Sequence, residues 1–508
     1  MRVCLIEPPK YVSLSNFVST IAMPPIGTAY IAAVIEQAGH ELTVIDAHGL
    51  GLTHYFNYKK MRVRGLDPDQ IVARVPPDSQ AIALGSMFSA HWPVIRAIFR
   101  GLREKFPQAL LILGGEHGTG FPEFSLEQSP LDVVVLGEGE ETIVELLEIH
   151  EHSQDFSSVS GIAYRDRDDI HINPRRKRIK NIDDLPLPAW HHFPIEDYLQ
   201  VNQPHGAAQG RFMPMLATRG CPFSCTFCTS PNMWTNLWIP RDPAIVVDEM
   251  ELYIRRHKVT DFQFEDLTAI VRKDWIESFC QEIIDRKLKI TFQLPSGTRS
   301  EVIDYELALK MKAAGCHDFA FAPESGDERI LKAIKKEAHL PDVFKAAEEA
   351  MKAGISVGCF FIIGFPEEDW RSVWKTYKAI VKCAWMGFAN ANINAYSPQP
   401  NSESFRELVK NGVIKDLDDD YFMSLYSFQD FGRIKKSYNP KFPNMVLTFL
   451  VFFGAFIFYV VYFVRRPQRI WHLIRDLFSR KTENKTTKVA KAMLGDMKRI
   501  LSQKFRKY

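Results

Sequence analysis

Cysteine is scarce in this 508-residue chain, and neither sign of charge dominates it. Eight cysteines over this length exclude a small secreted fold held together by disulfides. The 63 basic and 61 acidic residues leave a formal net charge of +2, which by itself indicates no class of partner. The hydrophobic content of 46% and the charged content of 24% are ordinary for a globular protein, and the length predicts two or three domains.

The N-terminus lacks the apolar region of a secretory signal. It reads Met1-Arg-Val-Cys-Leu-Ile-Glu-Pro-Pro, which indicates a strand that runs into a turn. We therefore expect the bulk of the protein to be cytoplasmic.

Three of the eight cysteines form one compact motif. Cys221, Cys225 and Cys228 are spaced C-x3-C-x2-C directly after an apolar run at 212–217. A [4Fe–4S] cluster normally takes four thiolates, so three in eight residues would leave one iron open to bind another molecule. A structural zinc site is the alternative, but it usually shows a second pair of ligands, and the remaining cysteines are single. His205 could complete a zinc site only as a lone histidine.

This motif, with the aromatic Phe227 directly before its last cysteine, resembles the signature of radical S-adenosylmethionine (SAM) enzymes. In that family the open iron binds SAM, and an electron from the cluster cleaves SAM to a 5′-deoxyadenosyl radical. The resemblance implies that Cys221, Cys225 and Cys228 are both the metal ligands and the catalytic residues. It also implies a reductant such as flavodoxin or ferredoxin.

Residues 1–150 alternate short β-branched runs with helical patterns, as in a doubly wound, Rossmann-like α/β sheet. Strands are expected at 2–6, 41–45, 81–84, 109–113 and 132–136. Ligands of such sheets bind beyond the carboxyl ends of the strands. Those ends carry Ser86, the Gly114-Gly115 turn and the run Gly137-Glu138-Gly139.

The order of these segments resembles the cobalamin-binding domain that precedes the barrel in one large class of radical SAM enzymes. The resemblance implies that cobalamin contacts Ser86, Gly114, Gly115, Gly137, Glu138 and Gly139. Enzymes that ligate cobalt through a lower histidine carry Asp-x-His-x-x-Gly after the first strand, where this chain has Glu7-Pro8-Pro9. Asp46-Ala47-His48 follows the second strand instead, so we expect His48 to be an ordinary loop residue.

Residues 151–205 are expected to be a linker. Its basic run at 174–180 is short enough to be a solvated turn, so we predict no nucleic-acid partner.

Residues 206–440 contain six strand-then-helix units, with strands expected at 212–217, 261–265, 290–294, 318–322, 356–363 and 388–395. Six repeats predict a partial (β/α)6 barrel whose site lies at the C-terminal ends of the strands. By resemblance, Glu265 and Asp266 are assigned to the amino group of SAM, Arg299 and Glu324 to its other polar groups, and Gly364 to its adenine side. A carboxylate at a strand end can equally cap a helix.

The C-terminal region, 441–508, contains twenty uncharged residues at 445–464, which is long enough for one membrane crossing. Basic residues flank the run on both sides, so its orientation stays ambiguous, and it could span or re-enter the membrane. The tail from 465 to 508 has 14 basic and 3 acidic residues, and Met493, Met497 and Ile500 recur at helical spacing. That pattern favours a helix on an anionic membrane surface over one buried in the protein or in a dimer.

Together these features favour a membrane-attached, cobalamin-dependent radical SAM enzyme that methylates an unactivated carbon of a lipid-like or membrane-associated substrate. One alternative is oxidative ring formation of the anaerobic magnesium-protoporphyrin monomethyl ester cyclase type, whose domain order this chain also resembles. Another is a non-enzymatic, membrane-tethered cobalamin or redox sensor.

Overall fold

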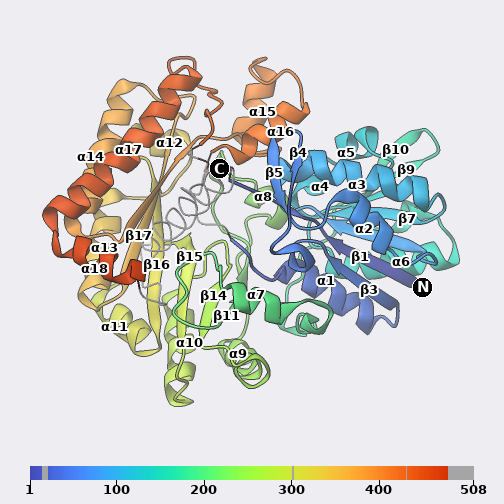
Figure 1. The fold of residues 1–508 in the computed structure, drawn as a ribbon, viewed down its shortest axis with the longest axis horizontal. Coiled ribbons are helices and arrows are strands. Elements are labelled where there is room, and N and C mark those ends of the chain that lie inside the picture. Colours follow the sequence, from blue (N-terminus) through green and yellow to red (C-terminus); the bar gives the residue numbers. More distant parts are fainter. Residues whose placement is uncertain (14–20, 300–301, 429, 431, 479–508) are drawn as a thin grey trace, which may run out of the picture.

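A computed structural model describes residues 1–478, apart from residues 14–20, 300, 301, 429 and 431. The first α/β domain and the barrel lie side by side, and helices α17 (Asn444–Arg465) and α18 (Gln468–Phe478) lie on the outer side of the barrel (Figure 1). The helical pattern predicted around Met493 falls outside the described residues.

The first domain is built on a seven-stranded sheet with the order β10-β9-β8-β7-β6-β1-β3. All five predicted strands are present and parallel, which confirms the doubly wound fold. Their bounds are β1 (Arg2–Glu7), β3 (Glu41–Asp46), β6 (Ala81–Gly85), β7 (Leu110–Gly114) and β8 (Val133–Val135).

Helices cover both faces of this sheet, so alternate residues of each strand enter two different cores. Val3 and Leu5 pack with α1 (Ile26–Gln37) and α6 (Glu140–His152), whereas Cys4 and Ile6 pack with α2 (Pro68–Arg74) and α3 (Trp92–Lys105). The helix after β1 and the helix after β6 therefore lie on opposite faces. Neighbouring strands with that property form the crevice in which doubly wound sheets bind ligands.

The sheet continues into residues that the sequence assigns to the linker. Strands β9 (Ile162–Asp166) and β10 (Asp169–Ile172) add an antiparallel edge beside β8. A three-stranded antiparallel sheet of β2 (Lys10–Val12), β5 (Met61–Arg64) and β4 (Tyr55–Tyr58) was also not predicted, because strands of three or four residues show too little periodicity.

The second domain is a six-stranded, all-parallel sheet in sequential order, as the six repeats predict. In the described chain no ladder joins the first strand to the last, so the barrel is open on one side. Its strands are β11 (Phe212–Met215), β14 (Asp261–Phe264), β15 (Thr291–Thr298), β16 (Cys316–Glu324), β17 (Ser356–Ile363) and β18 (Asn390–Ala395).

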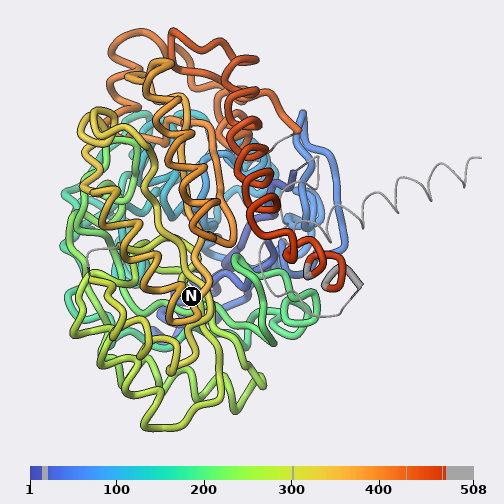
Figure 2. The backbone as a smooth tube through the Cα atoms, turned by 90° about the vertical axis from the view of Figure 1, so that its left-hand side faces the viewer, coloured from blue at the N-terminus to red at the C-terminus, as the bar shows by residue number. Residues whose placement is uncertain are grey.

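Amphipathic helices cover the outside of this sheet. They are α9 (Pro243–His257), α10 (Lys273–Asp285), α11 (Tyr305–Ala313), α13 (Leu340–Lys352) and α14 (Trp370–Met386). Helix α17 packs against α14 and β18, at the last strand of the open sheet (Figure 2).

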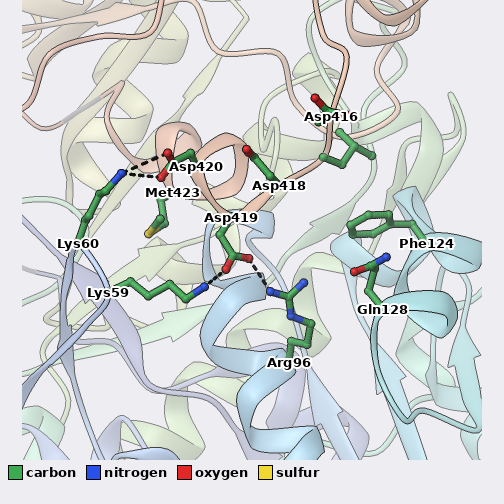
Figure 3. A pocket seen from close by; sticks show the side chains of 11 residues that line it. Lys59, Lys60, Arg96, Phe124, Gln128, Asp416, Asp418, Asp419, Asp420 and Met423 are labelled. Atoms are coloured by element: carbon green, nitrogen blue, oxygen red, sulfur yellow. Dashed lines mark hydrogen bonds and ion pairs between the residues drawn. The ribbon is translucent and has the colours of Figure 1, made fainter.

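Charged side chains join the first domain to helix α16 (Asp419–Tyr426). Asp419 pairs with Lys59 and, at 2.7 Å, with Arg96, while the amine of Lys60 lies 2.9 Å from the carboxylate of Asp420 (Figure 3). These pairs border an open pocket of about 630 Å³. Because its cations pair with its own anions and no predicted site residue lines it, we interpret it as a seam between the domains.

Candidate active site at the domain interface

The cysteine loop extends beyond the C-terminal end of β11, between β12 (Thr218–Arg219) and α8 (Ser230–Trp234). Backbone hydrogen bonds fix its shape: the amide of Cys228 donates to the carbonyl of Cys225 at 3.1 Å, and the amide of Thr226 donates to the carbonyl of Ile334 at 3.0 Å. The amide of Ser230 also donates to the Cys228 sulfur at 3.4 Å. These hydrogen bonds hold the backbone of the cysteine loop in place.

The donor set fits an iron–sulfur cubane better than one metal ion. Burial, together with the nearby Glu116 and the neighbouring thiols Cys225 and Cys221, raises the pKa of the Cys228 thiol to about 12, so bound metal charge is needed to hold all three as thiolates. The three sulfurs do not all lie within 4.8 Å of one another. Tetrahedral zinc with bonds of about 2.3 Å would hold them roughly 3.8 Å apart.

Two cations lie beside the thiols. Burial raises the pKa of the thiols of Cys221 and Cys225, and the charges of Lys336 and Arg299 oppose that rise. The guanidinium of Arg299 lies 3.7 Å from the ring centroid of Phe223, within the cysteine loop. The structure thus brings the predicted Arg299 to the loop. Lys336 escaped prediction because it follows the short helix α12 (Glu328–Ala333) and belongs to no motif.

The two acidic residues after β14 have different surroundings. Asp266 is buried, and its carboxylate accepts bonds from the amide of Ala217 at 3.1 Å and the hydroxyl of Thr218 at 2.7 Å, so it holds the chain that leads to the cysteine loop. One carboxylate oxygen of Glu265, Oε2, lies 3.2 Å from Nδ1 of His205. The other oxygen, Oε1, is buried and has no hydrogen-bond partner in the described structure. Of the two carboxylates, Glu265 therefore has a free acceptor oxygen for the amino group of a ligand.

Glu324 is the last residue of β16 and Gly364 follows β17, and both have left-handed backbone conformations, with φ of 65° and 101°. Glu324 is buried, and its carboxylate lies 3.4 Å from the amine of Lys336. A side chain at Gly364 would meet Leu447 of α17 at 2.6 Å, so the apolar helix reaches the rim of the barrel. A non-glycine residue held at positive φ costs about 1–3 kcal/mol, and such strain concentrates at functional sites.

The strand ends of the first domain leave room for a large ligand. The hydroxyl of Ser86 is buried without a partner in the described structure, directly after β6. Gly115 has φ of 95°, and a Cβ there would lie 2.7 Å from the carbonyl oxygen of Ser86, so only glycine fits that turn. A Cβ at Gly114 would meet nothing within 4 Å. The open space at Gly114 and the orphaned hydroxyl of Ser86 are compatible with a bound cofactor.

Comparison with known families gives two matches along the chain. The B12 binding domain model matches residues 18–147, and the radical SAM superfamily model matches residues 215–380. This chain is a radical SAM enzyme with a B12-binding domain. Its cofactors are a [4Fe–4S] cluster, SAM and cobalamin, as the two resemblances imply.

Relatives of this radical SAM enzyme cover both domains. An uncharacterised methyltransferase of Pyrococcus horikoshii is 27% identical over 82% of this chain and 84% of its own length. Cytidylyl-2-hydroxyethylphosphonate methyltransferase of Streptomyces wedmorensis is 29% identical over 77% of this chain and 78% of its own length. The anaerobic magnesium-protoporphyrin IX monomethyl ester cyclase of Cereibacter sphaeroides is 30% identical over 76% of this chain and 60% of the cyclase.

A solved structure shares the fold. The radical SAM methyltransferase TsrM of Kitasatospora setae, with cobalamin and a [4Fe–4S] cluster bound, has a TM-score of 0.67 and 14% identity over 89% of this chain and 91% of its own.

Glu138, a predicted cobalamin contact, lies in a buried ionic network between the two domains of the radical SAM enzyme. Its oxygens lie 2.6 Å from Arg178 and 3.2 Å from Arg219, and Arg219 also binds Glu140 at 2.6 Å. Arg178 comes from the basic run that was expected to be a solvated turn. Both oxygens of Glu138 are therefore engaged by protein, and its contact with cobalamin stays a prediction.

The remaining predicted glycines flank this network. Gly137 has φ of 78°, and its amide donates to the hydroxyl of Thr119 at 3.0 Å. A Cβ at Gly139 would lie 3.0 Å from the end of Ile31 in α1, so that glycine allows α1 to pack closely.

His48 is buried in the loop after β3, and its assignment as an ordinary loop residue stays a prediction. Its Nδ1 lies 3.3 Å from the carbonyl oxygen of Arg64, and burial lowers its pKa well below the usual value. Asp46 accepts a 2.8 Å bond from the hydroxyl of Tyr198 and another from the amide of Gly49, and burial raises its pKa to about 7. Asp46 thus ties the first domain to α7 (Ile195–Val201).

The glycine turn of the first domain touches the cysteine loop directly. Glu116, which follows Gly115 and begins α4 (Glu116–Gly120), accepts a hydrogen bond from the hydroxyl of Thr229, the residue after Cys228. Burial raises the pKa of Glu116, and its charge in turn raises that of Cys228. The expected cobalamin edge and the cluster loop therefore share one interface.

Proposed function

We propose that this radical SAM enzyme transfers a methyl group to an unactivated carbon of a lipid-like, membrane-associated substrate. When bound, the cluster with SAM supplies a hydrogen-abstracting radical, and cobalamin supplies the methyl group. The contact between Glu116 and Thr229 carries the proposal, since it puts the glycine turn and the cysteine loop at one interface. A substrate held there could meet both reagents without leaving the protein, which is the condition for efficient transfer.

The surrounding residues have separate tasks in this proposal. Cys221, Cys225 and Cys228 hold three irons, and the charges of Lys336 and Arg299 stabilise the anionic thiolates. The orphaned oxygen of Glu265 is suited to accept a hydrogen bond from the amino group of SAM.

Ser86 and the open face of Gly114 are suited to the cobalamin side. Exclusion of water from this interface during the reaction would protect a reactive carbon centre from quenching.

The lipid-like substrate is supported by the position of helix α17. Leu447 at its N-terminal end touches Gly364, directly beyond β17 at the catalytic rim of the barrel. Among the described residues α17 is the one helix long and apolar enough to cross a membrane. An apolar substrate in a bilayer would therefore find the catalytic rim next to the membrane-attached part of the enzyme.

Oxidative ring formation is the second candidate, favoured by the similarity to the magnesium-protoporphyrin cyclase. The two differ in how they use SAM, because only methyl transfer also consumes SAM as a methyl donor. The sensor alternative is set aside because the chain is an enzyme.

The experiment uses anaerobically reconstituted full-length protein with cobalamin, SAM carrying a deuterated methyl group, a chemical reductant and a membrane lipid extract. We expect 5′-deoxyadenosine and S-adenosylhomocysteine to accumulate in comparable amounts, and the deuterated methyl to appear in a lipid. The variant Cys225→Ala should lose both products, whereas Cys280→Ala, a buried cysteine outside the motif, should keep them. Formation of 5′-deoxyadenosine alone in the presence of substrate would favour ring formation and refute the proposal.

A further inference from the structure

Helix α17 has two unlike faces. One face packs on the barrel through Leu447, Leu450, Val451, Gly454, Phe458 and Tyr462, all buried. The other carries the exposed stripe Met445, Phe449, Phe452, Phe456, Val460 and Val464. Phe449 is 62% exposed and Val464 is 77% exposed, so this stripe has no protein partner in the described chain.

Contacts hold α17 to the barrel along its whole length. Near its start, Leu447 fills the space at Gly364, and in the middle the hydroxyl of Tyr377 on α14 donates to the carbonyl of Leu450 at 2.8 Å. Just beyond its end, Arg466 donates to the carbonyls of Trp385 at 3.0 Å and of Met386 at 2.8 Å, at the C-terminus of α14. Both ends of α17 are thus fixed to the same side of the molecule.

Neighbouring helices extend the exposed stripe. Three tryptophans of α14, Trp370, Trp374 and Trp385, are each more than half exposed. The ring of Trp370 lies 5.0 Å from that of Phe442 just before α17, and the guanidinium of Arg465 lies 4.8 Å from the ring of Trp385. Helix α18 adds Ile470, Trp471 and Ile474. We call the exposed residues of α14, α17 and α18 the aromatic face.

Basic residues outnumber acidic ones around the aromatic face. Helix α14 (370–386) contains four basic residues and no acidic one, and residues 431–478, through the end of α18, contain eight basic residues and one acidic residue, Asp476. An isologous contact between two copies would set these cations against one another, which disfavours a dimer through this face. An anionic lipid surface complements both the charge and the tryptophans, which prefer the interface between water and hydrocarbon.

We propose that the aromatic face lies on an anionic bilayer with α17 parallel to the membrane plane, so that α17 does not cross the membrane. A crossing helix would have to leave the barrel, because lipid would have to replace the contacts at Gly364, Tyr377 and Trp385. The basic residues after α17 then stay on the side of the catalytic domain, in agreement with the preference of cationic segments for the cytoplasmic leaflet. This inference deepens the proposed membrane attachment and does not depend on the methyl transfer.

Flotation with lipid vesicles tests the surface. We expect the full-length protein to float with vesicles that contain about one-third phosphatidylglycerol, and to bind vesicles of phosphatidylcholine at least about tenfold more weakly, with loss of binding as salt is added. The double variant Phe452→Ser/Phe456→Ser and the charge variant Arg371→Glu/Lys378→Glu should each reduce binding to anionic vesicles about tenfold or more.

The matched control is Leu309→Ser/Val413→Ser, which changes two exposed apolar residues away from the aromatic face and should bind as the unmodified protein does. Circular dichroism and cobalamin uptake show that each variant is folded. Equal binding by the control and both variants, or no binding by the unmodified protein, would refute the proposed face.

A topology experiment distinguishes a helix α17 that lies in the membrane plane from one that crosses the bilayer. The protein is bound from outside to sealed anionic vesicles, and a C-terminal affinity tag should then remain accessible to protease. Brominated lipids in the vesicles should quench tryptophan fluorescence less in Trp374→Phe/Trp385→Phe than in the unmodified protein. A protected tag would mean that α17 crosses the bilayer. That result would overturn the in-plane arrangement and leave the assay for methyl transfer untouched.

Discussion

At the scale of single residues, the two domains are joined by buried charges that satisfy one another. Arg219 is 6% exposed and binds both Glu138 and Glu140, while Arg178 shares Glu138. The carboxylates raise the pKa of Arg219, although burial alone would lower it. Such a network contributes little net stability when complete, but breaking it leaves a buried charge unpaired.

Arg219→Met should therefore lower the free energy of unfolding by about 3–5 kcal/mol, because Glu138 and Glu140 lose a buried partner. Urea denaturation followed by fluorescence measures the change. The comparison is Arg255→Met, an exposed arginine paired with Glu251 one helical turn away, which should change stability by less than about 1 kcal/mol. Equal effects of the two substitutions would show that the network is not what holds the interface.

Glu368 makes stability depend on pH. Burial raises its pKa to about 8, and the amides of Gly364 and Phe365, which donate to its carboxylate, only partly oppose the rise. Because the folded pKa lies above the unfolded value of about 4.3, the folded state favours the protonated acid. Its contribution to stability is complete at low pH and is lost as the pH rises toward 8.

Glu368→Gln should remove that dependence. Relative to the unmodified protein, the variant should gain stability between about pH 5 and pH 8, by on the order of 1 kcal/mol for each pH unit crossed, and the difference should level off above that range. Urea unfolding at several pH values measures the difference between the two proteins, which cancels the contributions of other titrating groups. A difference that is constant with pH would contradict the raised pKa.

At the scale of elements, the two glycines of the turn after β7 have different roles: Gly115 is needed for the backbone to fold, and Gly114 leaves space for a ligand. Gly115 cannot accept a side chain, because its φ is 95° and a Cβ would lie 2.7 Å from the Ser86 carbonyl oxygen. A methyl group at Gly114 meets no atom of the protein within 4 Å.

Gly114→Ala should leave the cobalamin-free protein as stable as before and weaken cobalamin binding at least about tenfold, since the added methyl enters the space assigned to the ligand. Gly115→Ala should destabilise the cobalamin-free protein itself, by about 1–3 kcal/mol. Thermal unfolding and titration followed by cobalamin absorbance give the two quantities. Unchanged cobalamin affinity in Gly114→Ala would show that cobalamin does not bind next to this turn.

The elements themselves were predictable wherever their residues repeat regularly. All eleven expected strands of the two large sheets are present, because buried parallel strands read as short apolar runs. Contacts between distant segments leave no such pattern, which is why Lys336, Arg178 and the buried stripe of α17 were missed. In the sequence, residues 445–464 are uniformly apolar. Only the packed structure distinguishes the face of α17 that lies on the barrel from the face that is exposed.

At the scale of the whole molecule, α17 is part of the catalytic domain, and removing it should not release a soluble enzyme. A chain ending at residue 442 would expose β18 and α14 and lose five large buried side chains, Leu447, Leu450, Val451, Phe458 and Tyr462. At about 1.5–3 kcal/mol for each buried side chain, the loss is roughly 8 kcal/mol or more. That is comparable to the whole free energy of unfolding of a typical domain, about 5–15 kcal/mol.

We therefore expect the chain ending at residue 442 to aggregate or to melt at least about 10 °C lower. A chain ending at residue 478 retains every contact of α17 described above, so its melting temperature should change by less than about 2 °C. Differential scanning fluorimetry of the two truncated proteins, purified in the same mild detergent, makes the comparison. A stable, soluble and active enzyme ending at residue 442 would mean that the helix is a detachable anchor, since an anchor packed only against lipid contributes nothing to the barrel it tethers.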